Sequence, residues 1–129
     1  MNDLLENKIA QFQWALDLLE NAVLPNANDL EIDGSIHRFE RCYELAWKTL
    51  KLRLERDGIT EISSPKAAIQ KGFIAGFIDN ESEWLSILKD RNLTVHTYDE
   101  KTAREIFQRL PGHLSAFMLL LDKIKRDLE

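Results

Sequence analysis

The fold class is decided by residues 103–128, which read AREIFQRLPGHLSAFMLLLDKIKRDL. Apolar residues recur in this stretch at alternating steps of four and three, which places them on one stripe of an amphipathic helix. The stripe comprises Ala103, Phe107, Leu110, Leu114, Phe117, Leu121, Ile124 and Leu128. The spacing of four and three residues continues through Pro111, so we expect either one helix kinked there or two collinear helices.

The same periodicity predicts two long helices at the start of the chain. The apolar stripe of the first is Leu5, Ile9, Phe12, Leu16, Leu19 and Val23, and the sequence PNAN at 25–28 ends it. The stripe of the second is Ile36, Phe39, Tyr43, Ala46, Leu50 and Leu54, and Gly58 follows as a helix stop. Periodicity close to seven residues in the first and last helices is typical of left-handed antiparallel bundles.

Two shorter helices are expected between residues 64 and 97. Ser64 and Pro65 read as the cap and first residue of a short helix that extends through 72–78. Asn80 with Glu83 resembles a capping box that opens the next helix. The apolar side of that helix would carry Trp84, Leu88 and Val95.

The pair Thr97 and Glu100 repeats the capping signal, so this helix should end near His96 and the last helix should begin almost at once. No stretch alternates apolar and polar residues as a strand would. The sequence therefore predicts an all-α protein, an antiparallel up-and-down four-helix bundle with a short extra helix.

Length and composition indicate one globular domain over residues 1–129, with 44% hydrophobic and 30% charged residues. The N-terminus lacks the pattern of a secretion signal and no apolar run could cross a bilayer, so we expect a cytoplasmic protein without membrane contact. The single cysteine, Cys42, permits no internal disulfide and is interpreted as a core or interface residue. No zinc-ligand spacing occurs, and neither a metal nor a cofactor is predicted.

Functional residues are expected in the stretch DRNLTVHTYD at 90–99, where one helix gives way to the next. Five polar or ionisable residues stand where a short turn would suffice. Arg91 supplies a permanent planar cation that binds phosphate in two-pronged fashion, and His96 supplies an imidazole, a group that can accept or donate a proton. Together they predict a phosphodiester site with His96 as general base or acid and Arg91 on the developing phosphorane charge.

The spacing of Arg91, His96 and Tyr98 makes this stretch specific. With eight Arg, three His and two Tyr in the chain, the pattern should arise by chance about 0.003 times, against about 0.5 times for a loosely spaced Arg and His alone. On an ideal helix Arg91 and His96 point about 140° apart, whereas Asn92 and His96 share a face. Either the reach of the arginine closes this gap within one chain, or two such junctions face each other across a homodimer and form a joint cleft, which is the arrangement we predict.

The same residues also have ordinary structural interpretations. Arg91 could form an ordinary ion pair with a neighbouring helix, His96 could stand at a helix C-terminus, and Tyr98 could be a boundary aromatic. The three tryptophans are expected as core or interface anchors and Glu44 with Lys48 as a helix-face pair. His37 and His113 have no companions and are interpreted as solvated, without a role.

The junction resembles the HEPN superfamily of nucleotide-binding helical domains, whose pattern of Arg, Asn and a spaced His is matched by Arg91, Asn92 and His96. The chain is more closely similar to the nucleotidyltransferase substrate-binding protein family. The matching pieces are ELAWK at 44–48, Gly58, SP at 64–65, ID at 78–79, Trp84, RN at 91–92 and HTYD at 96–99. They span residues 44–99, and the flanking helices fit by length and pattern only.

This resemblance implies a homodimeric helical core and a minimal nucleotidyltransferase encoded nearby as partner. Some HEPN proteins with such partners are the toxins of toxin–antitoxin pairs, ribonucleases that cleave RNA without metal through the Arg and His. Their partners can silence them by attaching AMP to the tyrosine two residues after the His, a position that Tyr98 occupies. The resemblance thus assigns catalysis to Arg91 and His96, binding to Asn92 and modification to Tyr98.

Two functions of different classes follow. The first is a metal-independent ribonuclease toxin neutralised by adenylylation of Tyr98, with RNA as substrate. The second is a non-catalytic substrate-binding or adaptor subunit of the nucleotidyltransferase. The net charge of −5 favours the second function, because RNA binding usually needs a basic face. The complete set of Arg91, Asn92, His96 and Tyr98 favours the first.

Overall fold

The computed structural model describes residues 3–128 of the chain. Its helices are α1 (Asp3–Ala22), α2 (Asp29–Arg56), α3 (Pro65–Ile74), α4 (Glu81–Leu93), the 3-10 turn η1 (Thr94–His96) and α5 (Glu100–Lys125). No strand occurs in this range, and none of its helices has the length and apolar content needed to cross a membrane. The all-α class is therefore confirmed.

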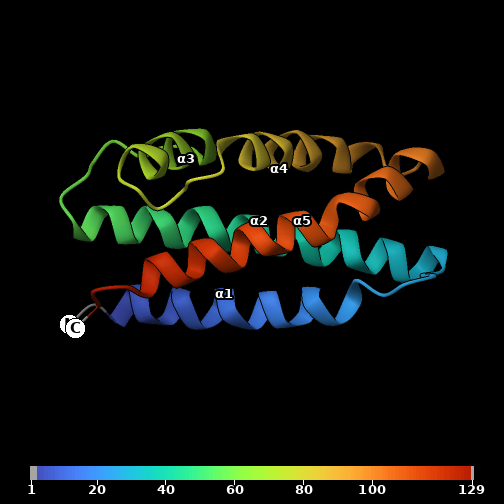
Figure 1. The fold of residues 1–129 in the computed structure, drawn as a ribbon, viewed down its shortest axis with the longest axis horizontal. Coiled ribbons are helices and arrows are strands. Elements are labelled where there is room, and N and C mark those ends of the chain that lie inside the picture. Colours follow the sequence, from blue (N-terminus) through green and yellow to red (C-terminus); the bar gives the residue numbers. More distant parts are fainter. Residues whose placement is uncertain (1–2, 129) are drawn as a thin grey trace.

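The helices form an up-and-down bundle of four helical segments, one of which consists of α3 followed by α4 (Figure 1). α1 and α2 form an antiparallel hairpin, and α5 runs obliquely back across the bundle. α2 packs against α1, α3 and α5 and is the central helix. The turn from α1 to α2 and the junction from α4 to α5 lie at the same end of the bundle (Figure 1).

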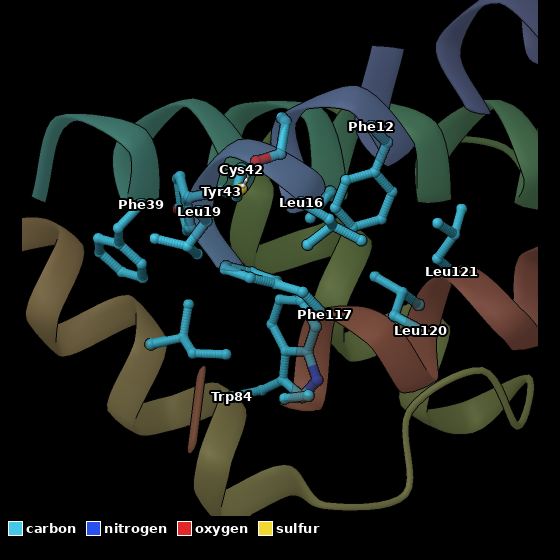
Figure 2. Packing of buried hydrophobic residues seen from close by; sticks show 14 of the residues in the cluster. Phe12, Leu16, Leu19, Phe39, Cys42, Tyr43, Trp84, Phe117, Leu120 and Leu121 are labelled. Carbon is cyan, nitrogen blue, oxygen red and sulfur yellow. Dashed lines mark hydrogen bonds between the residues drawn. The ribbon is translucent and has the colours of Figure 1, made fainter. Parts of the chain in front are cut away.

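The core lies where the apolar stripes meet. All six residues of the predicted α2 stripe are buried, as expected from the period of 3.6 residues. Aromatic rings fill the centre, where the Phe117 ring lies 5.6 Å from Trp84, 6.0 Å from Phe39 and 6.2 Å from Phe12 (Figure 2). These edge-on and tilted contacts connect α1, α2, α4 and α5.

Cys42 and the three tryptophans differ in how deeply they are buried. Cys42 is fully buried, and burial raises the pKa of its thiol to about 12, so it behaves as a core residue. Trp84 is a core anchor, but Trp14 is 55% exposed and lies under the guanidinium of Arg41. Trp47 is half-buried and donates its indole N–H to Glu44.

α5 is one continuous helix through Pro111, which resolves the two alternatives that the sequence left open. Its buried face differs in the middle from the predicted stripe, because Ile106 and Leu120 are buried while Phe107 and Leu114 are only half-buried. His113 lies on the same buried face and is 0% exposed. The interpretation of His113 as solvated was therefore wrong.

α3 ends earlier than the sequence suggested. We expected it to extend through 72–78, but it stops at Ile74. Gly76 takes a φ of +89°, a left-handed conformation that glycine adopts readily and that terminates the helix. The amide of Phe77 then returns to the carbonyl of Gly72 at 2.8 Å.

The caps of α4 and α5 also differ from expectation. Asn80 is the N-cap of α4, but its side chain makes no capping bond and Glu83 contacts His113 instead of closing a box. The cap of α5 is Asp99, not Thr97, and its carboxylate accepts from the amide and hydroxyl of Thr102. A complete capping box occurs elsewhere, between Asn28 and Glu31 at the start of α2.

Candidate functional site

The predicted site lies where α4 tightens into η1. Thr94 is buried at this point, and its hydroxyl donates to the carbonyl of Arg91 at 2.7 Å. A side chain that competes for a backbone carbonyl favours the end of an α-helix. The tighter turn places Val95 in solvent, 67% exposed, so its predicted position on the apolar side of the helix was wrong.

Arg91 lies in a partly buried cradle made by α2 and η1. Its guanidinium Nη1 donates to the Thr94 hydroxyl at 3.1 Å and lies 3.8 Å from a carboxylate oxygen of Glu40. The Tyr43 ring lies 5.8 Å from the guanidinium carbon, near enough for a cation–π contact. Burial raises the pKa of Tyr43, and the positive charge of Arg91 offsets part of that rise.

The guanidinium nevertheless keeps unused bonding capacity. Its Nε is buried without a hydrogen-bond partner among residues 3–128, and Nη2 makes no hydrogen bond in that range, although an arginine carries five N–H donors. The distance to Glu40 is that of an ion pair without a good hydrogen bond, and both side chains are about one third exposed, at 31% and 35%. Because Nε is closed to solvent, an oxyanion that reached Arg91 would meet the donors of the two terminal nitrogens.

His96 and Tyr98 form the second part of the junction. The His96 Nδ1 lies 3.4 Å from the Tyr98 hydroxyl, and the two rings meet edge to face with centroids 5.9 Å apart. Both residues are exposed, and Tyr98 reaches an exposed fraction of 85%. The Tyr98 hydroxyl is thus accessible from solvent and lies beside an imidazole nitrogen.

The two parts are neighbours along the chain but are not joined. Across residues 3–128, no hydrogen bond or ring contact links Arg91 to His96. Asn92 is exposed, and its side chain makes no hydrogen bond within that range. This separation agrees with the helical geometry that led us to expect a second copy of the chain at the site.

A small cavity of about 170 Å³ opens beside Tyr98. Its lining includes the carboxylates of Asp29, Asp33 and Glu100, and also Arg104. Arg104 pairs with Asp29 at 2.7 Å and with Glu100 at 3.9 Å, whereas Asp33 has no ion pair among the described residues. The surface next to Tyr98 is therefore net acidic and would repel an RNA backbone on this side.

Sequence reasoning missed a second polar cluster between α4 and α5, in which two buried side chains contact two partly exposed ones. The ring of the buried His113 contacts Glu83 through Nδ1 at 2.5 Å and Asp90 through Nε2 at 2.6 Å. Arg109 donates to both oxygens of Asp90, at 2.7 and 2.9 Å. We call Glu83, Asp90, Arg109 and His113 the buried network.

The carboxylate at the centre of this network is Asp90, which is only 1% exposed. Burial alone would raise its pKa, but hydrogen bonds and charge from Arg109 and His113 outweigh burial and hold the pKa below the ordinary value of 3.8. Asp90 therefore stays ionised inside the protein near neutral pH.

A signal for this network was present in the sequence. Glu83 and Asp90 are two helical turns apart, and Arg109 and His113 are one turn apart, so each pair shares a helix face. Acidic residues on one helix and basic residues on the next indicate a contact only once the pairing of the two helices is known. Between residues 3 and 128, no three His, Cys, Asp or Glu side chains are grouped to hold a metal ion.

Fold and junction together define a class of protein, a helical bundle that presents an arginine, a histidine and an exposed tyrosine at the end between two helices. A family model, "Nucleotidyltransferase substrate binding protein like", matches residues 6–126. The chain belongs to this family. The match confirms the resemblance based on 44–99 and extends it over the flanking helices.

Similar proteins agree with this assignment. The chain is 30% identical over 102 residues to the "Probable ribonuclease HepT" of Haemophilus influenzae, covering 76% of this chain and 70% of that protein. A solved structure from Thermus thermophilus is 35% identical, with a TM-score of 0.83 over 89% of this chain and 99% of that one. A tri-AMPylated Shewanella oneidensis HEPN toxin, solved with its MNT antitoxin, shares the fold at 20% identity, with a TM-score of 0.78 over 98% and 100% of the two chains.

Proposed function

We propose that this chain is the HEPN-type subunit of a two-component system with a minimal nucleotidyltransferase, and that it is a metal-independent ribonuclease silenced by transfer of AMP to Tyr98. The observation that carries the proposal is the junction itself. In a member of this family, Arg91 stands partly exposed at the end of α4, and the next turn presents His96 beside the Tyr98 hydroxyl.

Cleavage of RNA without metal requires a base, an acid and a group that stabilises the phosphorane. The ribose 2′-hydroxyl attacks the adjacent phosphorus and gives up its proton, and the bond from phosphorus to the leaving 5′-oxygen breaks as that oxygen takes up a proton. His96 is the proton carrier in this reaction, and Arg91 binds the phosphoryl oxygens. Asn92 lies on the exposed side of α4, where it binds the substrate.

A homodimer supplies what one chain lacks. The reaction needs a base and an acid at the same time, but only one histidine, His96, stands at each junction. Two copies related by a twofold axis would place two His96 and two Arg91 around one phosphodiester. The separation of Arg91 from His96 within one chain supports this arrangement.

Tyr98 is the site of control. Its oxygen attacks the α-phosphorus of ATP held by the nucleotidyltransferase, the bond to the β-phosphate oxygen breaks, and pyrophosphate leaves. The phenolic proton passes to solvent or to His96, whose Nδ1 lies 3.4 Å away. The attached phosphate then brings bulk and negative charge to the place where RNA would bind, so cleavage stops. The AMP-bearing HEPN toxin of similar fold supports this step.

RNA cleavage in the presence of EDTA tests the catalytic part. We expect the purified protein to cleave RNA, and Arg91→Ala and His96→Ala each to abolish cleavage while circular dichroism stays that of a helical protein. His37→Ala is the matched control, because His37 is an exposed histidine on α2 outside the junction. Equal activity in wild type and both junction variants would refute the assignment.

Mixing wild type with an inactive variant tests the dimer. If each cleft needs His96 from both chains, wild-type protein co-refolded with an excess of His96→Ala should lose most of its activity, because a mixed dimer holds only one His96. Light scattering should give twice the chain mass at micromolar concentration. A monomer in light scattering, with undiminished activity of the wild-type chains on mixing, would contradict the joint cleft.

Intact-mass analysis tests the control step. Protein co-expressed with the adjacent nucleotidyltransferase should be heavier by one or more AMP units, and Tyr98→Phe should remove the adduct. The chain has two tyrosines, and Tyr43 is only 6% exposed, so it offers no competing hydroxyl at the surface. No adduct with an active partner and ATP would overturn this step.

A non-catalytic adaptor is the second candidate, and the acidic surface beside Tyr98 favours it. Asp29, Asp33 and Glu100 border the junction, and the chain carries a net charge of −5. Such a surface suits a basic protein partner better than RNA. Inactivity of unmodified protein on varied RNAs, together with a stable complex with the nucleotidyltransferase, would favour this function.

A further inference from the structure

The buried network places the ionised carboxylate of Asp90 inside a small bundle, where a charge is costly. Asp90 and His113 are 1% and 0% exposed, and removing a charge from water costs several kcal/mol unless partners compensate. Compensation is complete here, because both Asp90 oxygens and both His113 ring nitrogens are bonded. Apolar residues of similar volume would stabilise the bundle as well or better. The network therefore calls for an explanation besides stability.

Its position suggests what that explanation is. Asp90 immediately precedes Arg91, in the last turn of α4 before η1. The His113 ring also lies against Phe39 of α2, with centroids 5.4 Å apart. A Cβ added to Gly112 would lie 3.4 Å from the Glu83 carboxylate, so α5 approaches α4 closely at this point.

Apolar contacts alone would fix the rotation of α4 about its own axis only weakly. Besides Asp90, only Trp84 and Ile87 are fully buried along the helix. Apolar burial is non-directional and tolerates sliding or rotation, whereas a carboxylate bonded by a two-pronged arginine and a histidine accepts one geometry. A rotation of α4 about its axis would carry Arg91 away from Glu40 and Tyr43 of α2.

We propose that the buried network is a positioning device for Arg91: Asp90, held by Arg109 and His113, sets the rotation of the last turn of α4 and so aims the guanidinium at the substrate phosphate. The proposal rests on the ribonuclease function for its kinetic consequence, but not for its structural one. Asp90 and His113 are positioning residues here, since both are buried and touch no substrate.

Asp90→Asn is the direct test, because it keeps the shape of the side chain and removes its charge. We expect kcat for RNA cleavage in EDTA to fall by about tenfold to 100-fold, the cost of a misplaced catalytic group, while KM stays within about twofold. The matched control is Asp79→Asn, which removes the exposed carboxylate that pairs with Lys123 of α5. The control should leave kcat, KM and the Arg91 signal unchanged.

A second readout observes Arg91 without any activity. In protein labelled with ¹⁵N-arginine, the Nε–H of Arg91 should be rigid in wild type and in Asp79→Asn, and mobile in Asp90→Asn at a temperature where all three are folded. If Asp90→Asn does not fold, Glu83→Gln changes a partly exposed member of the network that contacts His113 and should give a smaller shift in the same direction.

The outcomes separate the two proposals. A folded Asp90→Asn protein with wild-type kcat and a rigid Arg91 would overturn the positioning role. Loss of kcat with a rigid Arg91 would also overturn it. A wild-type protein without ribonuclease activity would instead overturn the proposed function, and Arg91 mobility would still decide the role of Asp90.

Discussion

The buried network and the junction meet in the sequence at the adjacent residues Asp90 and Arg91, and they differ in almost every physical respect. The buried network and the junction each contain a histidine, an arginine and a carboxylate partner. In the network every charged partner is bonded at 2.5 to 2.9 Å. In the junction the side-chain contacts of Arg91 with Thr94 and Glu40 and of His96 with Tyr98 are 3.1 to 3.8 Å, and the Arg91 Nε has no partner among residues 3–128.

This difference separates a structural role from a chemical one. Groups that satisfy one another completely have no capacity left for a ligand, and they hold helices in place. Groups that are exposed and incompletely bonded have capacity for a substrate or a partner. His113 and His96 illustrate the two cases within one chain, and variants of each should behave in opposite ways.

The largest effect on stability is expected at His113. His113→Leu keeps the volume but leaves Glu83 without its partner and Asp90 with Arg109 alone. The free energy of unfolding should fall by about 3 to 5 kcal/mol, the usual cost of breaking a buried charged pair. Urea unfolding followed by circular dichroism measures it, with His37→Leu at an exposed position as control. A change equal to that of the control would contradict the structural role of the network.

An intermediate effect should appear as acid sensitivity. Because the pKa of Asp90 is lower in the folded protein than in the unfolded chain, its ionised form stabilises the fold. That contribution is present above the unfolded value near 3.8 and is lost as the pH falls through the lower folded value. Wild type should therefore lose its stability advantage over Asp90→Asn below about pH 4. A difference between the two proteins that is constant from pH 7 to pH 3 would contradict this.

The smallest effect is expected at the junction. Arg91→Ala and His96→Ala should each change the free energy of unfolding by less than about 1 kcal/mol, because partly exposed ion pairs contribute little. Both variants should nevertheless be inactive on RNA. A loss of stability as large as that of His113→Leu would show that the junction is structural, and the comparison with the network would fail.

The sequence alone was sufficient to predict the helices and the junction. Amphipathic periods are local, so the stripe of α2 and the order of the helices could be read directly, and the spacing of Arg91, His96 and Tyr98 indicated a functional stretch. Helix ends were less accurate, as at Gly76 and Asp99, because several adjacent residues could have served as caps.

Only the tertiary structure decided which polar residues are buried and bonded. His113 was interpreted as solvated because its partners, Glu83 and Asp90, lie 23 or more residues away on another helix. An ion pair of Arg91 with a neighbouring helix was one alternative from the sequence, but its partner Glu40 could not be named, since those residues come together only when α4 packs on α2. The period of a helix determines its apolar face from neighbouring residues, whereas a polar contact depends on which distant segments the fold brings together.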